Sequence, residues 1–100
     1  MQSYADLTEF MIRYPESEYM DAARERLIFL RNLIASSELD GAEYYMKRGA
    51  YLAAVNRANY VLKNIPNSTE RERALRILKE AYKQLGYDEY AERISGFETN

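Results

Sequence analysis

The side chains that most often carry catalysis are scarce in this sequence, with carboxylates as the exception. The 100 residues include no histidine and no cysteine, which removes the commonest general base, the commonest metal ligand and the thiolate nucleophile. Acidic pairs such as Asp40 with Glu43, or Glu70 with Glu72, could do acid–base work. Such work needs burial that the apolar pattern does not indicate, so a solvated helix face is the preferred interpretation. The sequence therefore predicts no enzyme, no cofactor and no metal site.

Three basic residues are better candidates for binding a partner. Lys47 and Arg48 stand at the end of an expected helix, where positive charge complements the helix dipole without any further role. Arg57 instead lies within a helix beside Asn56, on the side opposite an apolar stripe. An arginine fork suits a partner's carboxylate, and arginine is enriched at binding hot spots. Partner binding and plain solvation both remain open for Arg57.

Tyr44 and Tyr45 form an aromatic pair that could stack a base or a sugar, but a structural role is preferred for Tyr45. An aromatic residue, a glycine and an alanine recur in the chain at offsets of four and nine. The two sets are Tyr45, Gly49 and Ala54, and Tyr82, Gly86 and Ala91. This spacing is typical of tetratricopeptide repeats, in which two antiparallel helices approach closely around a glycine turn. Tyr44 is the freer of the two tyrosines.

Composition and charge describe one small globular domain without an affinity for nucleic acid. Apolar residues make up 47% of the sequence and charged residues 30%. Fourteen basic and sixteen acidic residues give a net charge of −2, whereas nucleic-acid binding needs a basic stripe. No apolar run approaches the roughly 20 residues of a membrane span.

Turn signals divide the chain into about five helices. Pro15 and Pro66 end the helices before them, and the serines that follow, Ser17 and Ser68, are expected to cap the next helices. The expected helices cover about 3–13, 18–35, 51–64, 69–85 and 88–97. Whether the second helix breaks at 36–37 or continues to Arg48 stays open. Alternating charges over 70–80 predict an exposed face crossed by salt bridges.

The predicted fold is all-α, with antiparallel helix pairs of tetratricopeptide type stacked in a short right-handed solenoid. Residues 1–100 form one repeat domain. Residues 1–15 match the second half of a truncated repeat, 16–66 a complete repeat, 67–97 the last repeat and 98–100 a frayed tail. Because the chain starts in the middle of a repeat, we expect it to be a fragment of a longer protein.

One segment carries a family resemblance. Residues 43–57, EYYMKRGAYLAAVNR, resemble the BamD family, also called YfiO or ComL, of tetratricopeptide lipoproteins in the bacterial outer-membrane β-barrel assembly machinery. The stretches RYPESEY at 13–19 and LIFLRN at 27–32 are similar as well. The resemblance covers almost the whole chain and corresponds to the C-terminal portion of the family, although it weakens after Pro66.

The resemblance implies a protein-interaction scaffold at the periplasmic face of the outer membrane. Family members dock the periplasmic POTRA domains of BamA, and accessory lipoproteins where these exist. Arg48 and Arg57 fall in the part of the motif expected to face BamA, with Tyr44, Asn56 and Lys47 as neighbours. The family is anchored by a lipidated N-terminal cysteine that this sequence lacks, which fits a fragment that touches the membrane only through that missing anchor. No nucleic acid or small-molecule substrate is implied.

Two other functions stay open. An unrelated tetratricopeptide adaptor would bind a linear peptide on its concave face instead of a folded domain. A small hydrolase or carbohydrate-binding helical domain would need a pair of carboxylates buried in a pocket.

Overall fold

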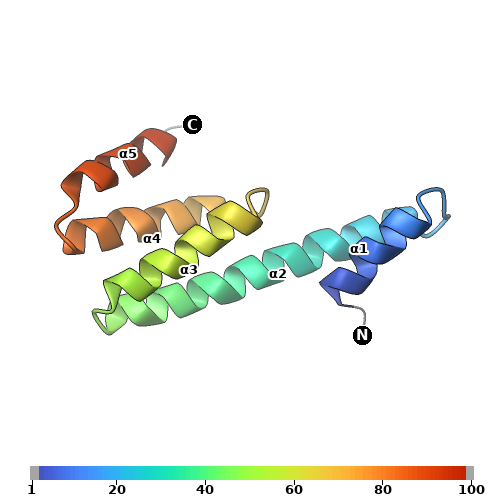
Figure 1. Ribbon diagram of the computed structural model, residues 1–100, viewed down its shortest axis with the longest axis horizontal. Coiled ribbons are helices and arrows are strands. Elements are labelled where there is room, and N and C mark those ends of the chain that lie inside the picture. Colours follow the sequence, from blue (N-terminus) through green and yellow to red (C-terminus); the bar gives the residue numbers. More distant parts are fainter. Residues whose placement is uncertain (1–2, 99–100) are drawn as a thin grey trace.

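The computed structural model describes residues 3–98, and all of its regular structure there is helical (Figure 1). The described part holds five helices in chain order. They are α1 (Tyr4–Arg13), α2 (Met20–Lys47), α3 (Tyr51–Asn64), α4 (Arg71–Gln84) and α5 (Asp88–Glu98). The predicted all-α class is confirmed, and the expected helices agree with these except at the second.

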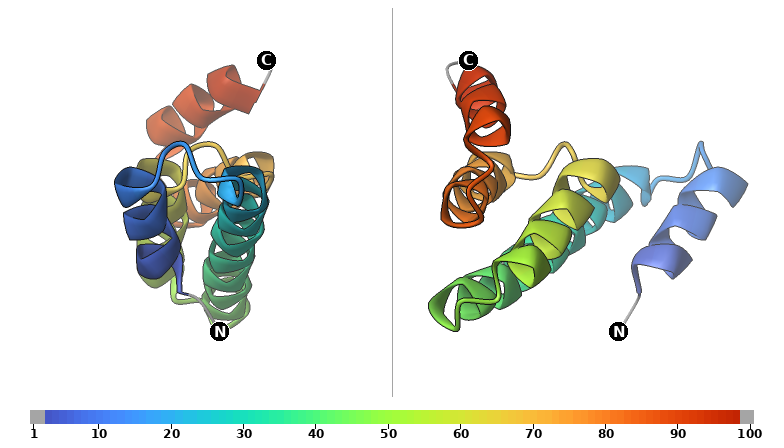
Figure 2. Two further views of the ribbon diagram at one scale, coloured as in Figure 1. Left: turned by 90° about the vertical axis from the view of Figure 1, so that its right-hand side faces the viewer. Right: turned by 60° about the vertical axis from the view of Figure 1, so that its left-hand side comes forward.

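Each helix packs on its neighbour in the sequence, so the molecule is elongated, with extents of 52 × 28 × 15 Å. α3 runs back along the C-terminal half of α2, and α4 contacts both of them (Figures 1 and 2). α1 packs only on α2 among the described elements, and it lies beside the N-terminal half of that helix. This sequential packing is consistent with tetratricopeptide-type stacking.

α2 is a single helix of 28 residues that continues through Ser36 and Ser37. The question left open by the sequence is therefore answered in favour of one long helix. Serine costs a helix interior only about 0.5 kcal/mol relative to alanine. The flanking Ala35, Leu39 and Ala42 are fully buried, and their burial outweighs that cost.

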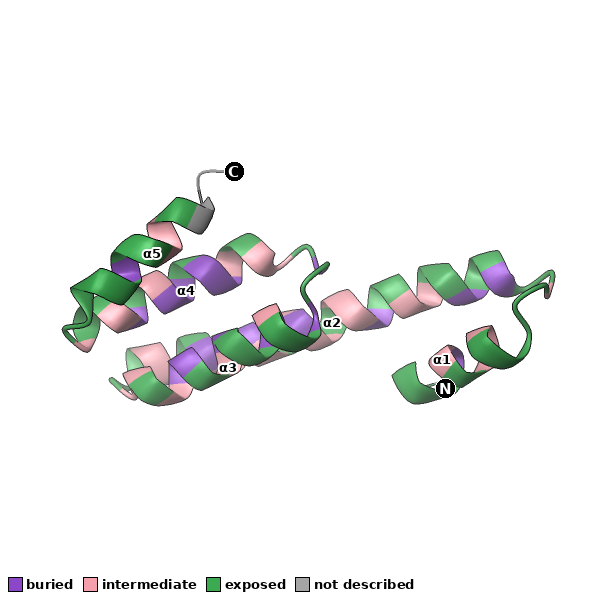
Figure 3. Cartoon of the chain, turned by 45° about the horizontal axis from the view of Figure 1, so that its top comes forward, coloured by how far each residue is buried: buried purple, intermediate pink, exposed green. Residues whose placement is uncertain are grey.

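Most of the buried apolar residues fall into two clusters (Figure 3). The larger cluster joins the C-terminal half of α2 to α3 and α4. It includes the apolar stripe expected opposite Arg57, which consists of Ala54, Ala58, Val61 and Ile65. The smaller cluster joins α1 to the N-terminal half of α2 through Leu7, Ala23 and Leu30. The two ends of α2 thus belong to different packing units.

The two glycine turns have the same geometry. Gly49 and Gly86 adopt φ angles of +76° and +84°, the left-handed conformation in which a side chain is disfavoured. The amide of Ala50 donates to the Tyr45 carbonyl at 2.9 Å, and that of Tyr87 donates to the Tyr82 carbonyl at 2.8 Å. These six-to-one hydrogen bonds identify two Schellman motifs, which explains why the spacing recurs in the sequence.

The two proline turns also resemble each other, but their serines do not cap the following helices as predicted. The Ser17 hydroxyl accepts from the Tyr19 amide at 3.1 Å, and the Ser68 hydroxyl accepts from the Glu70 amide at 3.3 Å. Tyr19 and Glu70 are themselves the N-cap residues, and their side chains make no capping bond. The serines therefore stabilise the turn that leads into each helix, one step before the cap.

Three smaller predictions concern the C-terminal tail, the division into repeats and the absence of a membrane span. Glu98 is the last residue of α5, while 99–100, the remainder of the expected tail, lie outside the described residues. The assignment of segments to individual repeats stays a prediction. None of the described helices is long and apolar enough to span a membrane.

Candidate protein-docking site

The end of α2 at the Gly49 turn presents the first group of predicted binding residues. Tyr44, Lys47 and Arg48 are exposed there. The Arg48 Nη1 donates to the Tyr44 hydroxyl at 2.9 Å, and its guanidinium carbon lies 5.4 Å from the Tyr44 ring centroid. These contacts orient Arg48 back along the helix. No carboxylate in the described part of the chain pairs with its guanidinium, so most of its five N–H donors face solvent.

Arg57 is placed differently from Arg48, because it crosses from α3 to α2. Its Nη1 donates to Glu38 Oε2 at 3.2 Å, and its guanidinium carbon lies 5.4 Å from the Tyr45 ring centroid. Hydrogen bonding with Tyr45, together with the Glu38 charge, raises the pKa of Arg57. Arg57 is therefore not simply solvated, since it is engaged within the chain and partly exposed, and binding of a partner by Arg57 stays a prediction.

Gly41 provides the space for this crossing. A Cβ atom at Gly41 would lie 3.2 Å from Arg57 Cδ, closer than ordinary van der Waals contact. Glu38, Gly41 and Tyr45 follow one another at spacings of three and four, so they form one side of α2 against which Arg57 lies. Sequence reasoning missed Glu38 and Gly41, although an acid, a glycine and an aromatic at this spacing are the signal that could have found them.

The tyrosine pair links the two arginines into one row. The Tyr44 and Tyr45 rings meet edge to face with their centroids 5.7 Å apart. Each ring carries one arginine, so the order in space is Arg48, Tyr44, Tyr45, Arg57. We call these four side chains the arginine–tyrosine row. Lys47 lies beside the row on α2, whereas Asn56 is exposed on α3 and its side chain makes no hydrogen bond to the described residues.

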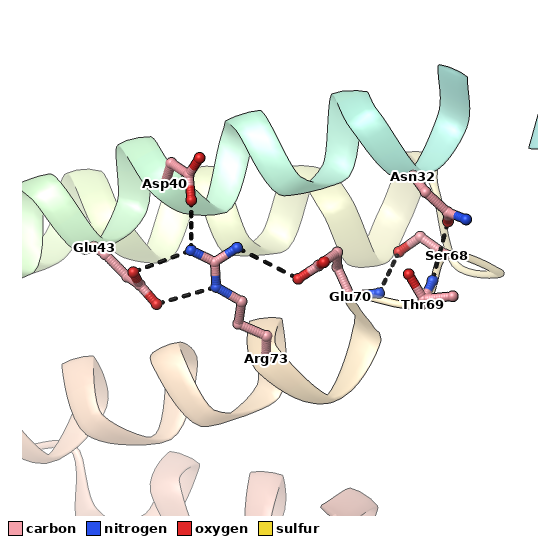
Figure 4. Close-up of polar contacts among 7 residues, drawn as sticks. All are labelled: Asn32, Asp40, Glu43, Ser68, Thr69, Glu70 and Arg73. Carbon is pink, nitrogen blue, oxygen red and sulfur yellow. Dashed lines mark hydrogen bonds and ion pairs between the residues drawn. The ribbon is translucent and has the colours of Figure 1, made fainter. Parts of the chain in front are cut away.

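Arg73 corrects the prediction of an exposed charged face on α4 at one position, because Glu72, Arg76 and Glu80 are exposed there whereas Arg73 is partly buried. Its side chain is only 21% exposed and lies between α2 and α4 (Figure 4). Nη2 is 2.6 Å from Asp40 Oδ1 and 3.0 Å from Glu43 Oε2, and Nη1 is 3.4 Å from Glu70 Oε2. An alternating charge pattern on one helix does not reveal that a second helix supplies the partners.

The Arg73 contacts also account for Asp40, Glu43 and Glu70 of the acidic pairs, while Glu72 lies 3.5 Å from Arg71. The hydrogen bond from Arg73 lowers the pKa of Glu43 despite its partial burial, and the Lys47 charge adds to this effect. Arg73 thus forms ion pairs with Asp40, Glu43 and Glu70, and those with Asp40 and Glu43 fasten α4 to α2 (Figure 4). Within residues 3–98 no cluster of acidic side chains has the arrangement of a metal site.

The lowered pKa of Glu43 predicts a pH dependence of stability. A carboxylate whose pKa is lower in the folded chain stabilises the fold above its ordinary value of 4.5, and this contribution is lost as the pH falls through the folded pKa. Because Glu43 is half exposed, we expect the loss to be at most about 1 kcal/mol. Urea denaturation from neutral pH to about pH 3 should show a shallower acid loss in Glu43→Gln than in the parent chain. Equal slopes would contradict the assignment.

Comparison with known proteins places the sequence of this chain in a family. The family model described as YfiO, an outer membrane lipoprotein, matches residues 1–96. Relatives named outer membrane protein assembly factor BamD are 36% identical over 91 residues in Vibrio cholerae and 38% identical over 90 residues in Neisseria meningitidis serogroup A. A relative of the same name in Xylella fastidiosa strain 9a5c is 39% identical over 85 residues.

These matches cover most of this chain but a minor part of each relative. They include 91%, 90% and 85% of the chain, which corresponds to 38%, 34% and 29% of the respective relatives. The chain therefore spans about a third of the length of the curated relatives that it matches.

Proposed function

Because the chain belongs to the BamD/YfiO family of outer membrane lipoproteins, we propose that it acts in outer membrane protein assembly by docking the periplasmic POTRA region of BamA. The relatives are named as assembly factors, and the family is not catalytic. In this proposal the chain works at the periplasmic face of the outer membrane and also offers surface to accessory lipoproteins. The binding residues are Arg48, Arg57, Tyr44, Asn56 and Lys47.

The observation that carries the proposal is the arginine–tyrosine row. Its members lie within 43–57, the segment with the strongest family resemblance. Arg48 is exposed, held in one orientation by Tyr44 and not paired with a carboxylate among the described residues. A preoriented arginine on an aromatic ring is the type of group that dominates binding energy at protein interfaces. It suits an acidic patch on a folded partner domain.

Charge reversal at Arg48 tests the proposal. We expect Arg48→Glu to weaken binding of the purified BamA POTRA region by about tenfold or more, since loss of a hot-spot residue costs about 2 kcal/mol or more and about 1.4 kcal/mol is a factor of ten. Titration calorimetry measures the affinity, and circular dichroism should show unchanged helicity. The matched control is Arg76→Glu, the same change at an exposed arginine of α4. An unchanged affinity for Arg48→Glu, or an equal loss in the control, would remove Arg48 from the site.

Arg57 needs a different test, because its charge reversal also sets two carboxylates against each other at Glu38. The double variant Glu38→Arg with Arg57→Glu restores an internal ion pair with exchanged signs. If Arg57 contacts the POTRA region directly, the double variant binds as weakly as Arg57→Glu alone. If the double variant recovers the parent affinity, Arg57 acts by supporting the row.

The choice of ligand distinguishes the docking proposal from the peptide-adaptor alternative. A linear-peptide adaptor would bind short peptides taken from the POTRA sequence as tightly as it binds the folded domain. The docking proposal expects the folded domain alone to bind, because the row presents a rigid surface rather than a groove for an extended chain.

A further inference from the structure

The side chain of Arg57 lies directly over the backbone of α2 at Gly41. A Cβ atom at Gly41 would be 3.2 Å from Cδ, 3.3 Å from Nη1 and 3.4 Å from Cζ of Arg57. The arginine therefore crosses the α2 backbone closely from its aliphatic stem to its guanidinium group. The two helices run side by side here, since α3 follows the C-terminal half of α2 (Figure 1). The crossing needs the space that a side chain at position 41 would fill.

The helix itself gives no reason for a glycine at this position. Gly41 lies in the interior of α2, and positive φ angles occur among the described residues only at the turn glycines Gly49 and Gly86. An alanine would therefore fit the backbone of α2 at position 41. It would also favour the helix, because glycine loses more conformational freedom on folding than alanine does. A residue that breaks a local folding rule in this way is expected where function requires it.

Two side chains of α2 hold Arg57 in the space that Gly41 leaves open. Glu38 Oε2 accepts a hydrogen bond from Nη1 at 3.2 Å, and the Tyr45 ring centroid lies 5.4 Å from the guanidinium carbon. Glu38 precedes Gly41 by three positions and Tyr45 follows it by four, so all three share one face of the helix. The Arg57 side chain remains 40% exposed. It is thus held in one place and is still accessible to a partner.

We infer that Gly41 is a positioning residue for docking, because the lack of a side chain there lets Arg57 lie between Glu38 and Tyr45 in the orientation that the POTRA region meets. This inference rests on the proposed function and adds to it a residue that acts through Arg57. An arginine that is already ordered loses less freedom on binding than a mobile one, which strengthens the complex. The glycine thus lowers the stability of the helix and raises the affinity of the site.

Gly41→Ala should therefore weaken docking without weakening the fold. Titration calorimetry of the full 100-residue chain with the purified BamA POTRA region should show an affinity about fivefold lower, which corresponds to about 1 kcal/mol for the loss of order in one side chain. The melting temperature should equal that of the parent or exceed it by up to about 5 °C. The partly exposed ion pair between Arg57 and Glu38 contributes too little to reverse this sign.

A larger side chain and a matched control extend the test. Gly41→Leu introduces another good helix former, and it should lower the POTRA affinity further because it fills more of the space that Arg57 occupies. Gly96→Ala is the control, since a Cβ atom there would meet no other atom within 4 Å. It should leave the affinity unchanged.

The NMR signals of Arg57 report its position without any partner. In the parent chain the Tyr45 ring should shift the side-chain proton signals of Arg57 through its ring current, since the two groups are in contact. Gly41→Ala should move these signals toward the values in Tyr45→Leu, in which the ring is missing. Gly96→Ala should leave them in place.

A double-mutant cycle tests whether Gly41 acts through Arg57. Arg57→Ala should itself weaken POTRA binding, and Gly41→Ala added to Arg57→Ala should then cause no further loss. A full additional loss would mean that position 41 affects docking by another route and would overturn the inference. The same conclusion would follow if Arg57→Ala bound as tightly as the parent.

The remaining outcomes separate this inference from the proposed function. If the parent chain binds the POTRA region and Gly41→Ala binds equally well, or if its Arg57 signals do not move, the positioning role is wrong and the docking function stands. A lower melting temperature of Gly41→Ala would make Gly41 a packing residue and would also overturn the inference. If the parent chain does not bind the POTRA region at all, the proposed function fails and the inference fails with it.

Discussion

Replacement of Arg73 by glutamine should lower the free energy of unfolding by about 2 kcal/mol, because hydrogen bonds between charged groups contribute about 1.5–3 kcal/mol and exposure reduces that value. Arg73 holds Asp40, Glu43 and Glu70 together between α2 and α4, and its own side chain is 21% exposed. Without it, the three carboxylates would face one another across two helices. Urea denaturation followed by far-UV circular dichroism measures the loss.

Arg76→Gln is the matched control for Arg73→Gln, since Arg76 is exposed on the same helix and pairs with no acid in the described part. It should change stability by less than about 0.5 kcal/mol. A double-mutant cycle with Glu43→Gln should show that the combined loss is smaller than the sum of the single losses. Additive losses, or an equal effect of Arg76→Gln, would mean that the Arg73 ion pairs do not fasten α4.

Truncation of Leu39 to alanine should be the most destabilising of the changes considered, at about 3 kcal/mol. Leu39 is completely buried, and its cluster joins α2 to α3 and α4. The change leaves a cavity where three helices meet, and the surrounding side chains cannot fill it fully. For a domain of this size the melting temperature should fall by roughly 15 °C, at 4–8 °C for each kcal/mol.

Leu52→Ala is the control, because Leu52 is 63% exposed on α3 and loses the same atoms without a cavity. Its effect should stay within about 0.5 kcal/mol. A comparable loss in both variants would indicate that the α2–α3–α4 cluster does not hold the fold together. Both variants should still unfold in a single cooperative transition, by urea and by heat.

Most of the fold could be predicted from the sequence because its signals are local. The glycine spacing determines two Schellman turns, and the three-and-four spacing of Ala54, Ala58 and Val61 identifies the buried face of α3. The course of α2 at Ser36 could not be predicted in the same way. The low helix propensity of serine favours a break at this position, whereas the burial of neighbouring side chains favours a continuous helix. That burial depends on contacts with α3 and α4, which the local sequence does not reveal.

The candidate site was less predictable, because its contacts depend on how helices cross. Lys47, Arg48 and Tyr44 could be grouped from sequence because they lie within one turn or two of the same helix. The pairing of Arg57 with Glu38 joins residues 19 positions apart, and Arg73 reaches Asp40 across 33 positions. A helical pattern gives the face of each residue but not which residue of another helix it meets.

The unbroken course of α2 has a consequence for the relative rotation of its two ends. A regular helix advances about 1.5 Å and turns about 100° with every residue. Tyr19–Phe29 at one end and Tyr44–Arg48 at the other therefore have a fixed angular relation as well as a fixed separation. One residue inserted near Ser36 would leave the distance almost unchanged but turn one end by more than a quarter of a circle. The arginine–tyrosine row would then change its orientation relative to α1, even though the contacts within the row stayed intact.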